Sequence, residues 1–255
     1  EPNNEHSLAH NFVRTVFEDS KGHLLIGTYI GIQMYDPATD NFTPLAKLED
    51  TGETLESNIN SFIERKNGEI WVSGNVLCKL DIKDHLLTVR KVDIAVTSPG
   101  SLFEDKKQNV WMAKGEEGVY QLTPDNQLTL HLSKDNGYVK SICEDQRGNI
   151  YVGSIRKGLF IYDKERKTFV PVDLKEKGEL PVCFLYSGIP NELYIGTDGK
   201  GVVIYNIRTH EISEYKFDNN YFDSGNSKIH SILKDNSGNL WLAVYQKGVI
   251  LIPAR

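Results

Sequence analysis

The sequence lacks the features that mark a membrane protein or a nucleic-acid-binding protein. No apolar run approaches the roughly 18 residues that a membrane span needs, and residues 1–11 contain neither the basic nor the apolar segment of a signal peptide. Lys and Arg form no long run, and the net charge of the 255 residues is -6. This charge disfavours nucleic acid as a partner and contact with an anionic membrane. We expect a soluble chain, cytosolic or already cut from its targeting segment.

Cysteine is scarce, and its spacing disfavours metal and redox motifs. The three cysteines, Cys78, Cys143 and Cys183, show no Cys-x-x-Cys spacing, and each lies among apolar residues typical of strands. We therefore predict buried, unreactive thiols. The seven histidines show no His-x-x-x-His or similar ligand spacing. The sequence predicts no catalytic residue, no metal site and no cofactor.

Sustained helical periodicity is absent as well, and a repeated phrase is present in its place. The phrase joins an acidic, Gly-containing turn to an apolar or aromatic residue, as in "EDSKGHLLIG" from Glu18, "ERKNGEIWVS" from Glu64, "EDQRGNIYVG" from Glu144 and "KDNSGNLWLA" from Lys234. The residue three positions after the turn recurs at intervals of 40 to 47 residues: Leu25, Trp71, Trp111, Tyr151, Tyr194 and Trp241.

Each repeat is built of short strands. In the fourth repeat, Val139–Cys143 alternate apolar and polar side chains, Ile150–Gly153 continue after the turn, and Gly158–Tyr162 and Thr168–Val170 complete the set. Four antiparallel strands per repeat of this length are typical of β-propeller blades. We therefore predict an all-β fold, a β-propeller of four-stranded antiparallel blades with six repeats, in which each first strand lines the axis. Residues 1–255 form a single propeller segment, with blades that begin near residues 12, 58, 100, 138, 181 and 228.

The repeated turn has a structural interpretation. Its acidic side chain, as at Asp145, can accept backbone N–H bonds, and its Gly, as at Gly148, is free to take a positive φ. The following Trp or Tyr, including Trp241, packs between neighbouring blades, and a second Gly, as at Gly158, reverses the chain into the third strand. The acidic pairs are therefore expected to be structural rather than catalytic: Glu18/Asp19, Glu104/Asp105 and Glu144/Asp145.

The consensus of the repeats is V-x-S-I-x-E-D-x-x-G-N-[LI]-[WY]-[LIV]-G-[TS]-x-x-K-G-[LV]-x-[IL]-Y-[DN]. It resembles the two-component regulator propeller repeat over nearly the whole chain, from Val13 to Pro253. Repeats one, four and six match best. The second repeat lacks the Gly before its third strand, the third has Gln108 where the turn Gly belongs, and the fifth replaces the turn by "SGIPNE".

The resemblance implies that this chain is part of the periplasmic sensor region of a hybrid two-component histidine kinase of Bacteroidetes-type gut bacteria. In that family, seven-bladed propellers stand in tandem before an immunoglobulin-like domain, a membrane span and a cytoplasmic kinase. The resemblance thus implies a non-catalytic module that senses oligosaccharide breakdown products, forms a homodimer through the sensor region and signals to a kinase not present in this chain.

The number of blades in the natural protein stays open, because the sixth repeat ends at its third strand in "GVILIPAR". One interpretation is a closed six-bladed ring with a short last blade. The other is an arc of a seven-bladed or tandem propeller. We favour truncation of a longer natural chain, since the polar residues 1–11 would make a poor missing strand.

Two other functions stay open. A propeller hydrolase or lyase of the sialidase kind repeats a similar turn, Ser-x-Asp-x-Gly-x-Thr-Trp, and residues 236–241 fit most of it. Its chemistry would need an Arg cluster and a Tyr/Glu nucleophile pair near the axis, whereas the arginines stand at unlike positions of their blades: Arg14, Arg65, Arg147 and Arg156. The second of these two functions is a non-catalytic protein-interaction scaffold.

The candidate ligand-binding residues lie where the repeats differ. Lys157, Lys200 and Lys247 directly precede the third-strand Gly of three consecutive blades, with Arg156 beside the first of them, and the first three blades hold no cation there. We therefore expect one arc of the rim to be basic. These side chains are either solvated loop residues, or they bind an anionic ligand, such as a uronate- or sulfate-bearing oligosaccharide, or a partner's acidic surface.

Two aromatic residues join this candidate site. Tyr221 and Phe222 stand among the polar turn formers of residues 218–227, in the loop between the fifth and sixth blades. Three uses stay open for them: stacking on a sugar ring, packing over the blade edge, or anchoring an interface.

Overall fold

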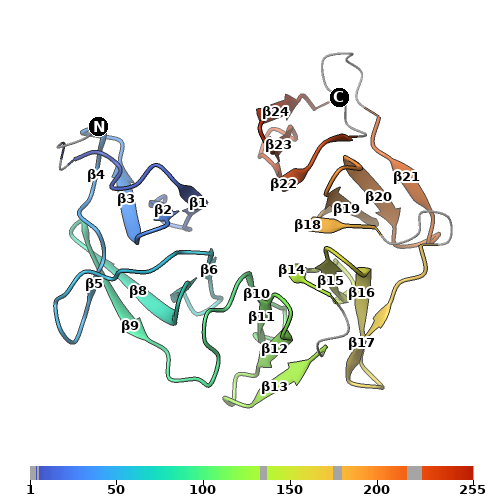
Figure 1. The fold of residues 1–255 in the computed structure, drawn as a ribbon, viewed down its shortest axis with the longest axis horizontal. Helices are drawn as coiled ribbons and strands as arrows, with labels where there is room; N and C mark the ends of the chain where they lie inside the picture. The colour runs from blue at the N-terminus through green and yellow to red at the C-terminus, as the bar shows by residue number, and fades with distance from the viewer. Residues whose placement is uncertain (1–3, 5, 133–136, 175–179, 217–225, 255) are drawn as a thin grey trace. The chain divides into compact units, whose positions relative to one another are not determined.

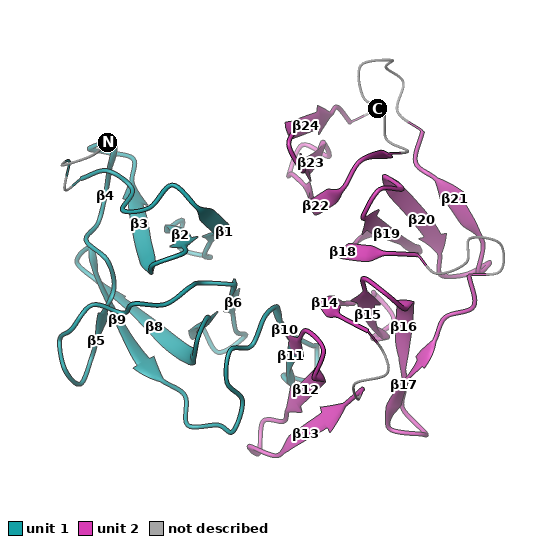
Figure 2. Cartoon of the chain, viewed as in Figure 1, with its two compact units in different colours: residues 1–112 teal, residues 113–255 magenta. Residues whose placement is uncertain are grey.

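The structure is a computed structural model that describes residues 4, 6–132, 137–174, 180–216 and 226–254. The regular elements in this part of the chain are β-strands, β1 to β24 (Figure 1), which confirms the all-β prediction. Among these residues, no helix has the length and apolar character that a membrane span requires. The chain divides into two compact units, unit 1 with residues 1–112 and unit 2 with residues 113–255 (Figure 2).

Unit 1 holds the sheets of the first two repeats. The first sheet has four antiparallel strands in chain order: β1 (Val13–Glu18), β2 (Leu24–Thr28), β3 (Ile32–Asp36) and β4 (Asn41–Phe42). The second sheet has the order β5-β9-β8-β7-β6: β5 (Lys47–Leu48), β6 (Ser61–Glu64), β7 (Ile70–Ser73), β8 (Leu77–Lys83) and β9 (Leu86–Lys91). Strands β6 to β9 form the antiparallel blade. The parallel pairing of β5 with β9 is an addition that the repeat pattern does not predict.

The third sheet begins at the end of unit 1 and has the order β10-β11-β12-β13: β10 (Leu102–Glu104), β11 (Val110–Lys114), β12 (Gly118–Leu122) and β13 (Leu128–His131). Unit 2 continues with the last three repeats. The fourth sheet contains β14 (Val139–Glu144), β15 (Ile150–Ser154), β16 (Gly158–Asp163) and β17 (Thr168–Pro171). The fifth contains β18 (Val182–Ile189), β19 (Glu192–Thr197), β20 (Val202–Asn206) and β21 (Ile212–Glu214). The sixth has three strands, β22 (Ile229–Lys234), β23 (Leu240–Val244) and β24 (Gly248–Ile252).

One carboxylate holds the turn between the first and second strands of a blade. In the fourth blade, Asp145 Oδ1 accepts the backbone N–H of Arg147 at 2.8 Å and that of Asn149 at 2.9 Å, and Oδ2 accepts the Asn149 side-chain amide at 2.8 Å. Asp105 and Asp235 make the equivalent bonds in the third and sixth blades. The predicted role of the acidic side chain as an acceptor of backbone N–H bonds is confirmed.

In the third and sixth blades the same carboxylate reaches the aromatic residue that follows the turn. Asp105 Oδ2 accepts the indole N–H of Trp111, and Asp235 Oδ2 accepts that of Trp241, both at 2.8 Å. The aromatic residue is buried, as predicted, at four positions: Trp71, Trp111, Tyr151 and Tyr194. The prediction is wrong for Trp241, which is 38% exposed, because no described strand of unit 2 covers its face of the sixth sheet.

The residue three positions before this aromatic or apolar residue has a positive φ in all six blades: Gly22 at 85°, Gly68 at 83°, Gln108 at 66°, Gly148 at 78°, Asn191 at 61° and Gly238 at 87°. The third and fifth repeats therefore keep the turn with a residue for which this conformation is costly. The turn between the second and third strands also contains a residue with a positive φ. This residue is the Gly that the sequence predicts to reverse the chain, with a φ of 81° for Gly158 and 64° for Gly201.

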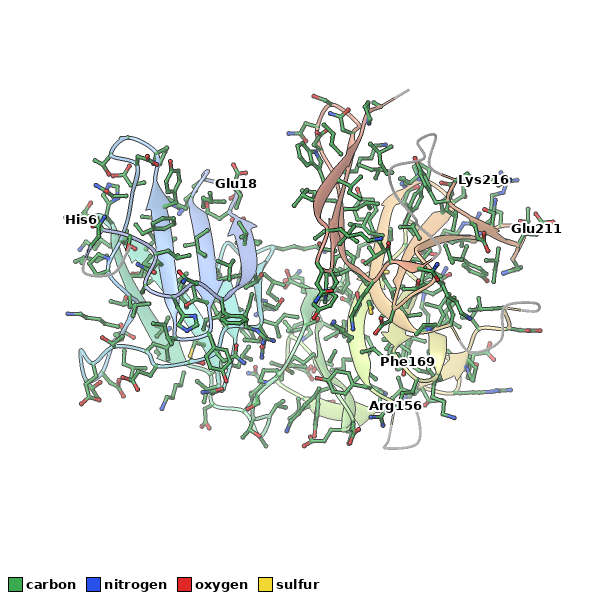
Figure 3. The ribbon with its side chains drawn as sticks, turned by 45° about the horizontal axis from the view of Figure 1, so that its top comes forward. His6, Glu18, Arg156, Phe169, Glu211 and Lys216 are labelled. Atoms are coloured by element: carbon green, nitrogen blue, oxygen red, sulfur yellow. The ribbon has the colours of Figure 1, made fainter. Side chains whose placement is uncertain are left out.

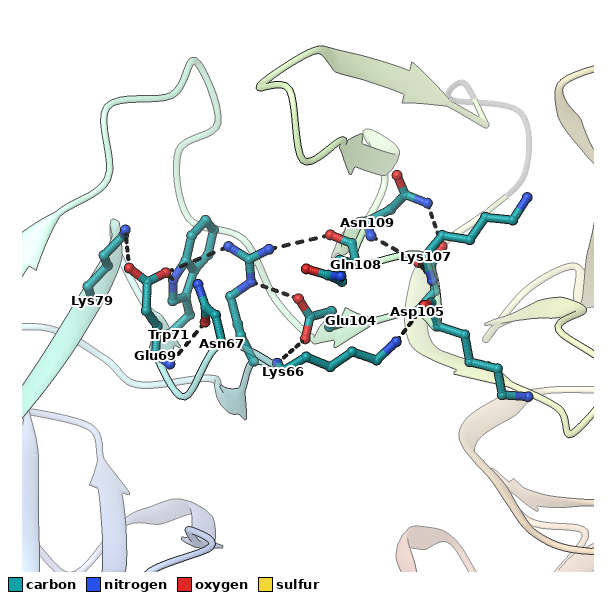
Figure 4. Close-up of polar contacts among 12 residues, drawn as sticks. Lys66, Asn67, Glu69, Trp71, Lys79, Glu104, Asp105, Lys107, Gln108 and Asn109 are labelled. Carbon is teal, nitrogen blue, oxygen red and sulfur yellow. Dashed lines mark hydrogen bonds and ion pairs between the residues drawn. The ribbon is translucent and has the colours of Figure 1, made fainter.

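The turn of one blade is tied to the next blade by the Glu that ends the next blade's first strand. In unit 1, Glu64 accepts the backbone N–H of Ser20 at 2.7 Å. Glu104 accepts the backbone N–H of Lys66 at 2.7 Å and the Arg65 Nε–H at 2.9 Å (Figure 4). Both members of the pair Glu104/Asp105 thus have structural partners, as the turn interpretation predicts.

Neighbouring blades pack through a β-branched residue placed over a glycine. The pairs are Val182 over Gly153 and Ile229 over Gly196 in unit 2, and Ile59 over Gly27 in unit 1. A Cβ on Gly196 would lie 2.9 Å from Ile229 Cγ2, closer than side chains normally approach. In unit 2 these contacts lie within the apolar cores between sheets, where the first strands β14, β18 and β22 are side by side (Figure 1).

The three cysteines are free and buried, as predicted. Burial raises the pKa of the Cys78 thiol to about 11 and that of Cys143 to about 12, and it raises the pKa of Cys183 as well. Because the thiolate is the nucleophile, these thiols are poor nucleophiles at neutral pH.

Candidate ligand site

The basic residues that the sequence singles out lie in the turns between the second and third strands of the last three blades. Arg156 and Lys157 follow β15, and their backbone N–H groups donate to Ser154 Oγ at 3.4 Å and 3.2 Å. Arg156 Nη1 lies 3.0 Å from Glu116 Oε1, and the two side chains are 64% and 63% exposed. Figure 3 shows Arg156 at the surface of unit 2. An ion pair this exposed contributes little stability.

Lys200 and Lys247 occupy the equivalent turns, and both are exposed. The backbone N–H of Lys200 donates to Thr197 Oγ1 at 3.0 Å, and that of Lys247 donates to the Val244 carbonyl at 3.1 Å. The Lys247 Nζ donates to Ser227 Oγ at 3.0 Å. Each predicted cation therefore sits at a turn, and a role in ligand binding stays a prediction for all of them. Tyr221 and Phe222 lie outside the described residues.

A surface hollow of about 480 Å³ lies between the fifth and sixth blades. Its lining residues are Asp198, Gly199, Asn226, Ser227, Lys228, Tyr245, Gln246 and Lys247. Of the predicted binding residues that the structure describes, Lys247 lines this hollow, whereas Arg156, Lys157 and Lys200 do not. A hollow of about 530 Å³ at the other end of β19 has one cation, Arg208, and no aromatic ring among its lining residues. The hollow beside Lys247 is therefore the better candidate site.

An ion pair and an exposed aromatic ring give this hollow its chemistry. Lys228 Nζ lies 2.6 Å from Asp198 Oδ2, and this hydrogen bond raises the pKa of Lys228. Tyr245 is 55% exposed, and its backbone N–H donates to the Lys228 carbonyl at 3.0 Å. The His230 ring packs edge-on against the Tyr245 ring, with 5.6 Å between centroids. The Tyr245 ring is thus held beside the ion pair with much of its surface open to solvent.

Positive charge exceeds negative charge around the hollow. Lys228 and Lys247 line it, and Asp198 supplies its carboxylate. Burial lowers the pKa of His230, and the charges of Lys140 and Lys228 lower it further, against the opposite effect of Asp198. His230 is therefore neutral at pH 7, and the nearby Lys140 adds a third cation to this end of the blades. The arrangement favours an anionic group.

The sequence interpretation missed Asp198, Lys228 and Tyr245. Asp198 and Lys228 are 30 positions apart and belong to successive blades, so only the packing of β18 against β22 brings them together. A usable signal was present in the repeats. The position directly after the second strand differs from blade to blade, and Asp198 and Tyr245 are its occupants in the last two.

The arginines engage separate partners within their units. Arg14 Nη2 donates to Asn60 Oδ1 at 3.2 Å, and Arg147 Nη2 donates to Asn191 Oδ1 at 3.4 Å, while Arg65 and Arg156 pair with glutamates as described above. A cluster that binds one carboxylate is thus not formed by these four in either unit. Among the described residues, no group of three or more His, Cys, Asp or Glu side chains is placed to hold a metal ion.

Small antiparallel sheets in chain order, packed on one another through their first strands, define a β-propeller protein. The model of the two-component regulator propeller family matches three stretches of the chain, residues 7–29, 133–156 and 223–246. These stretches fall in repeats one, four and six, which are the repeats that the sequence consensus predicts to match best.

Solved structures share the fold at low sequence identity. The extracellular domain of a hybrid two-component system from B. thetaiotaomicron is 17% identical, with a TM-score of 0.73 over 98% of this chain and 34% of that one. Virginiamycin B lyase from Staphylococcus aureus is 13% identical, with a TM-score of 0.74 over 97% of this chain and 83% of the lyase. PorZ, a surface component of the type-IX secretion system of Porphyromonas gingivalis, is 13% identical, with a TM-score of 0.71 over 94% and 38%.

Identities this low show a common fold and not a common activity. The chain spans 34% of the length of the B. thetaiotaomicron domain. Among curated protein sequences, none matches it.

Proposed function

We propose that this chain is a ligand-sensing, extracytoplasmic module of a hybrid two-component sensor. It responds to oligosaccharide breakdown products and signals to a kinase carried elsewhere in the protein, and this segment is not itself an enzyme. The family of its repeats supports the sensor class, and the B. thetaiotaomicron domain with the same fold belongs to such a system. A periplasmic location and a homodimer formed through the sensor region belong to the same proposal.

The hollow beside Lys247 is the observation that carries this proposal. The ammonium groups of Lys228 and Lys247 can donate charge-assisted hydrogen bonds to a carboxylate or a sulfate. The exposed ring of Tyr245 offers an apolar surface for the C–H face of a sugar ring, and Asp198 can accept a sugar hydroxyl. Together they fit an acidic oligosaccharide. Arg156, Lys157 and Lys200 hold further anionic units of a longer ligand.

Titration of the purified chain with uronate-bearing and neutral oligosaccharides of equal length tests the proposal. We expect the acidic ligands to raise the melting temperature and to bind with measurable heat. Lys247→Ala and Tyr245→Ala each weaken binding by about 5- to 30-fold, the usual effect of losing one important contact. Lys164→Ala, an exposed lysine at the opposite end of its blade, leaves binding unchanged. If no glycan shifts the melting temperature, this segment does not sense oligosaccharides directly.

A second candidate function is that of a propeller lyase or hydrolase. Its support is the fold shared with virginiamycin B lyase over 97% of this chain. Incubation of the chain with quinupristin and with polysaccharides, followed by mass spectrometry, separates the candidates, because product formation supports the enzyme and contradicts a sensor without catalysis. A protein-interaction scaffold would respond to no glycan and release no product.

A further inference from the structure

The first strands of the last three blades each contain a β-bulge. In β14 the register shifts between Val139 and Ser141, which leaves Lys140 as an extra residue in the pairing with β15. Cys183 is the extra residue of β18, and His230 is the extra residue of β22. A β-bulge turns its side chain away from the regular alternation of the strand. The bulge is shared by the three blades, and the residue that occupies it differs in each.

The three bulge residues lie near one another. Strand β18 packs against both β14 and β22, so Cys183 stands between Lys140 and His230 (Figure 1). Burial raises the pKa of Cys183, and the charge of Lys140 opposes this shift. Burial lowers the pKa of His230, and the charge of Lys140 adds to this shift. Lys140 therefore acts at both neighbouring strands, and it forms one cluster with His230.

This cluster adjoins the hollow between the fifth and sixth blades. The His230 ring packs against the Tyr245 ring, with 5.6 Å between centroids, and Tyr245 lines the hollow. Lys228 and Asp198 also line the hollow, and their charges act on the pKa of His230 in opposite directions. The bulge residues thus extend the hollow towards the first strands, and the whole arrangement lies within unit 2.

The charged and titratable groups around His230 come from every strand packed beside it. They are Lys140 on β14, Cys183 on β18, Asp198 after β19, Lys228 before β22 and Tyr245 after β23. Asp198 is already engaged by Lys228, with 2.6 Å between Oδ2 and Nζ. Because Lys140 is half-buried and His230 is exposed, a ligand can contact both. An anion placed there is attracted by an ammonium group and by a ring that can become cationic.

We propose that Lys140 and His230 bind a second anionic group of the ligand that occupies the hollow. This inference rests on the proposed function, and it narrows the ligand to an oligosaccharide with negative charge on two or more sugar units. A bound anion offsets the positive charges that disfavour protonation of His230, so the ring takes up a proton on binding. The complex then holds more protons than the free chain, and the affinity rises as the pH falls from about 8 to about 6.

Isothermal titration calorimetry tests the proposal with trisaccharides of different charge. The probes are trigalacturonate, a trisaccharide with one terminal glucuronate, and neutral maltotriose. Trigalacturonate binds about 10-fold more tightly than the singly charged trisaccharide. Lys140→Gln and His230→Gln each reduce this advantage to about 3-fold or less, and they leave the affinity for the singly charged probe unchanged. Lys164→Gln, at the opposite end of the fourth blade, alters neither affinity.

Titrations in two buffers of different ionisation enthalpy measure the proton uptake directly. Wild type takes up a fraction of a proton, at most about one, when it binds trigalacturonate at pH 7. His230→Gln takes up none. Circular dichroism verifies that every variant is folded.

Equal affinities for the two acidic trisaccharides overturn the proposal. An advantage of trigalacturonate that both variants retain also overturns it, because the second anionic group then binds elsewhere, and binding without proton uptake contradicts the role of His230. In these three cases the proposed function survives, since the singly charged probe still binds better than maltotriose. If it binds no better than maltotriose, the proposed ligand class fails, and this inference fails with it.

Discussion

At the scale of the residue, Gln108 shows that the turn geometry is fixed more firmly than the turn sequence. Its φ is 66°, a conformation that costs a residue with a Cβ about 1 kcal/mol. Its backbone carbonyl accepts the Arg65 Nη2–H at 3.4 Å, a bond that needs no side chain. We therefore expect Gln108→Gly to raise the free energy of unfolding by about 0.5 kcal/mol, since greater freedom of the unfolded chain offsets part of the gain. Urea denaturation measures the change.

Asn191 is the matched control, because it has a φ of 61° at the equivalent turn. Asn tolerates the left-handed region better than Gln does. Asn191→Gly should therefore stabilise the chain less than Gln108→Gly. A loss of stability in Gln108→Gly would show that the glutamine side chain contributes more than its backbone conformation costs.

Glu69 connects the stability of the second blade to pH. Its hydrogen bond to Lys79, at 2.6 Å, is the largest cause that lowers the pKa of Glu69 from 4.5 to about 2, and the Trp71 indole N–H at 3.0 Å adds to it (Figure 4). Since the pKa is lower in the folded state, the carboxylate stabilises the fold above pH 4.5, and this stabilisation is lost as the pH falls towards 2. Glu69→Gln should show a smaller loss of stability over this range in urea denaturation.

Lys79→Met is the companion variant, because it removes the main cause of the low pKa and leaves the carboxylate in place. It should also reduce the pH dependence between 4.5 and 2. If the free energy of unfolding depended on pH equally in wild type and in Glu69→Gln, Glu69 would not be the source of this pH dependence. Glu69 is 34% exposed, so solvent screening keeps the effect modest.

At the scale of the element, the packing of neighbouring blades depends on glycines that lie within strands rather than in turns. A Cβ on Gly153 would overlap Cγ1 of Val182, which enters from the first strand of the next blade. Gly153→Ala should destabilise the chain by about 1–3 kcal/mol, the usual cost of overpacking a core. Val182→Ala provides the test of cause. In that background the cost of Gly153→Ala should fall by at least half, and an unchanged cost would locate the strain elsewhere.

The elements could be predicted from the sequence to a large extent. Two signals located the blade strands: the alternation of apolar and polar residues within a strand, and the turn that recurs in each repeat. Both signals can be recognised within short segments of the sequence. Strand β5 was not predictable, since two residues carry no periodicity and their parallel partner β9 is about 40 positions away. The exposure of Trp241 was not predictable for a related reason. Burial depends on what covers a sheet, and its sequence matches that of the buried Trp111.

The site could be predicted only in part. Lys247 was found because its position differs between repeats, whereas the ion pair of Asp198 with Lys228 depends on the alignment of strands in two blades. Periodicity describes what the blades share. A binding site depends on side chains from different blades, and the contacts among those side chains follow from packing rather than from local sequence.

At the scale of the whole molecule, the charge of the chain opposes the proposed ligand while the charge of the site attracts it. The net charge is -6, yet Lys228 and Lys247 line the hollow and Lys140 lies near. The Debye length is about 10 Å at 0.1 M salt. Distant carboxylates are therefore largely screened from the ligand, whereas the two lining lysines act at contact distance, and the local attraction should dominate.

Salt dependence measures this balance. We expect the affinity for a uronate-bearing oligosaccharide to fall by about 10-fold between 0.05 and 0.5 M NaCl, since partly exposed ion pairs are weakened by screening. Binding of a neutral oligosaccharide of equal length should change little. Lys247→Gln should reduce the salt dependence for the acidic ligand, because it removes one of the two lining cations. An affinity that rises with salt would mean that repulsion by the net charge exceeds attraction by the site, and the acidic ligand would then have to bind elsewhere.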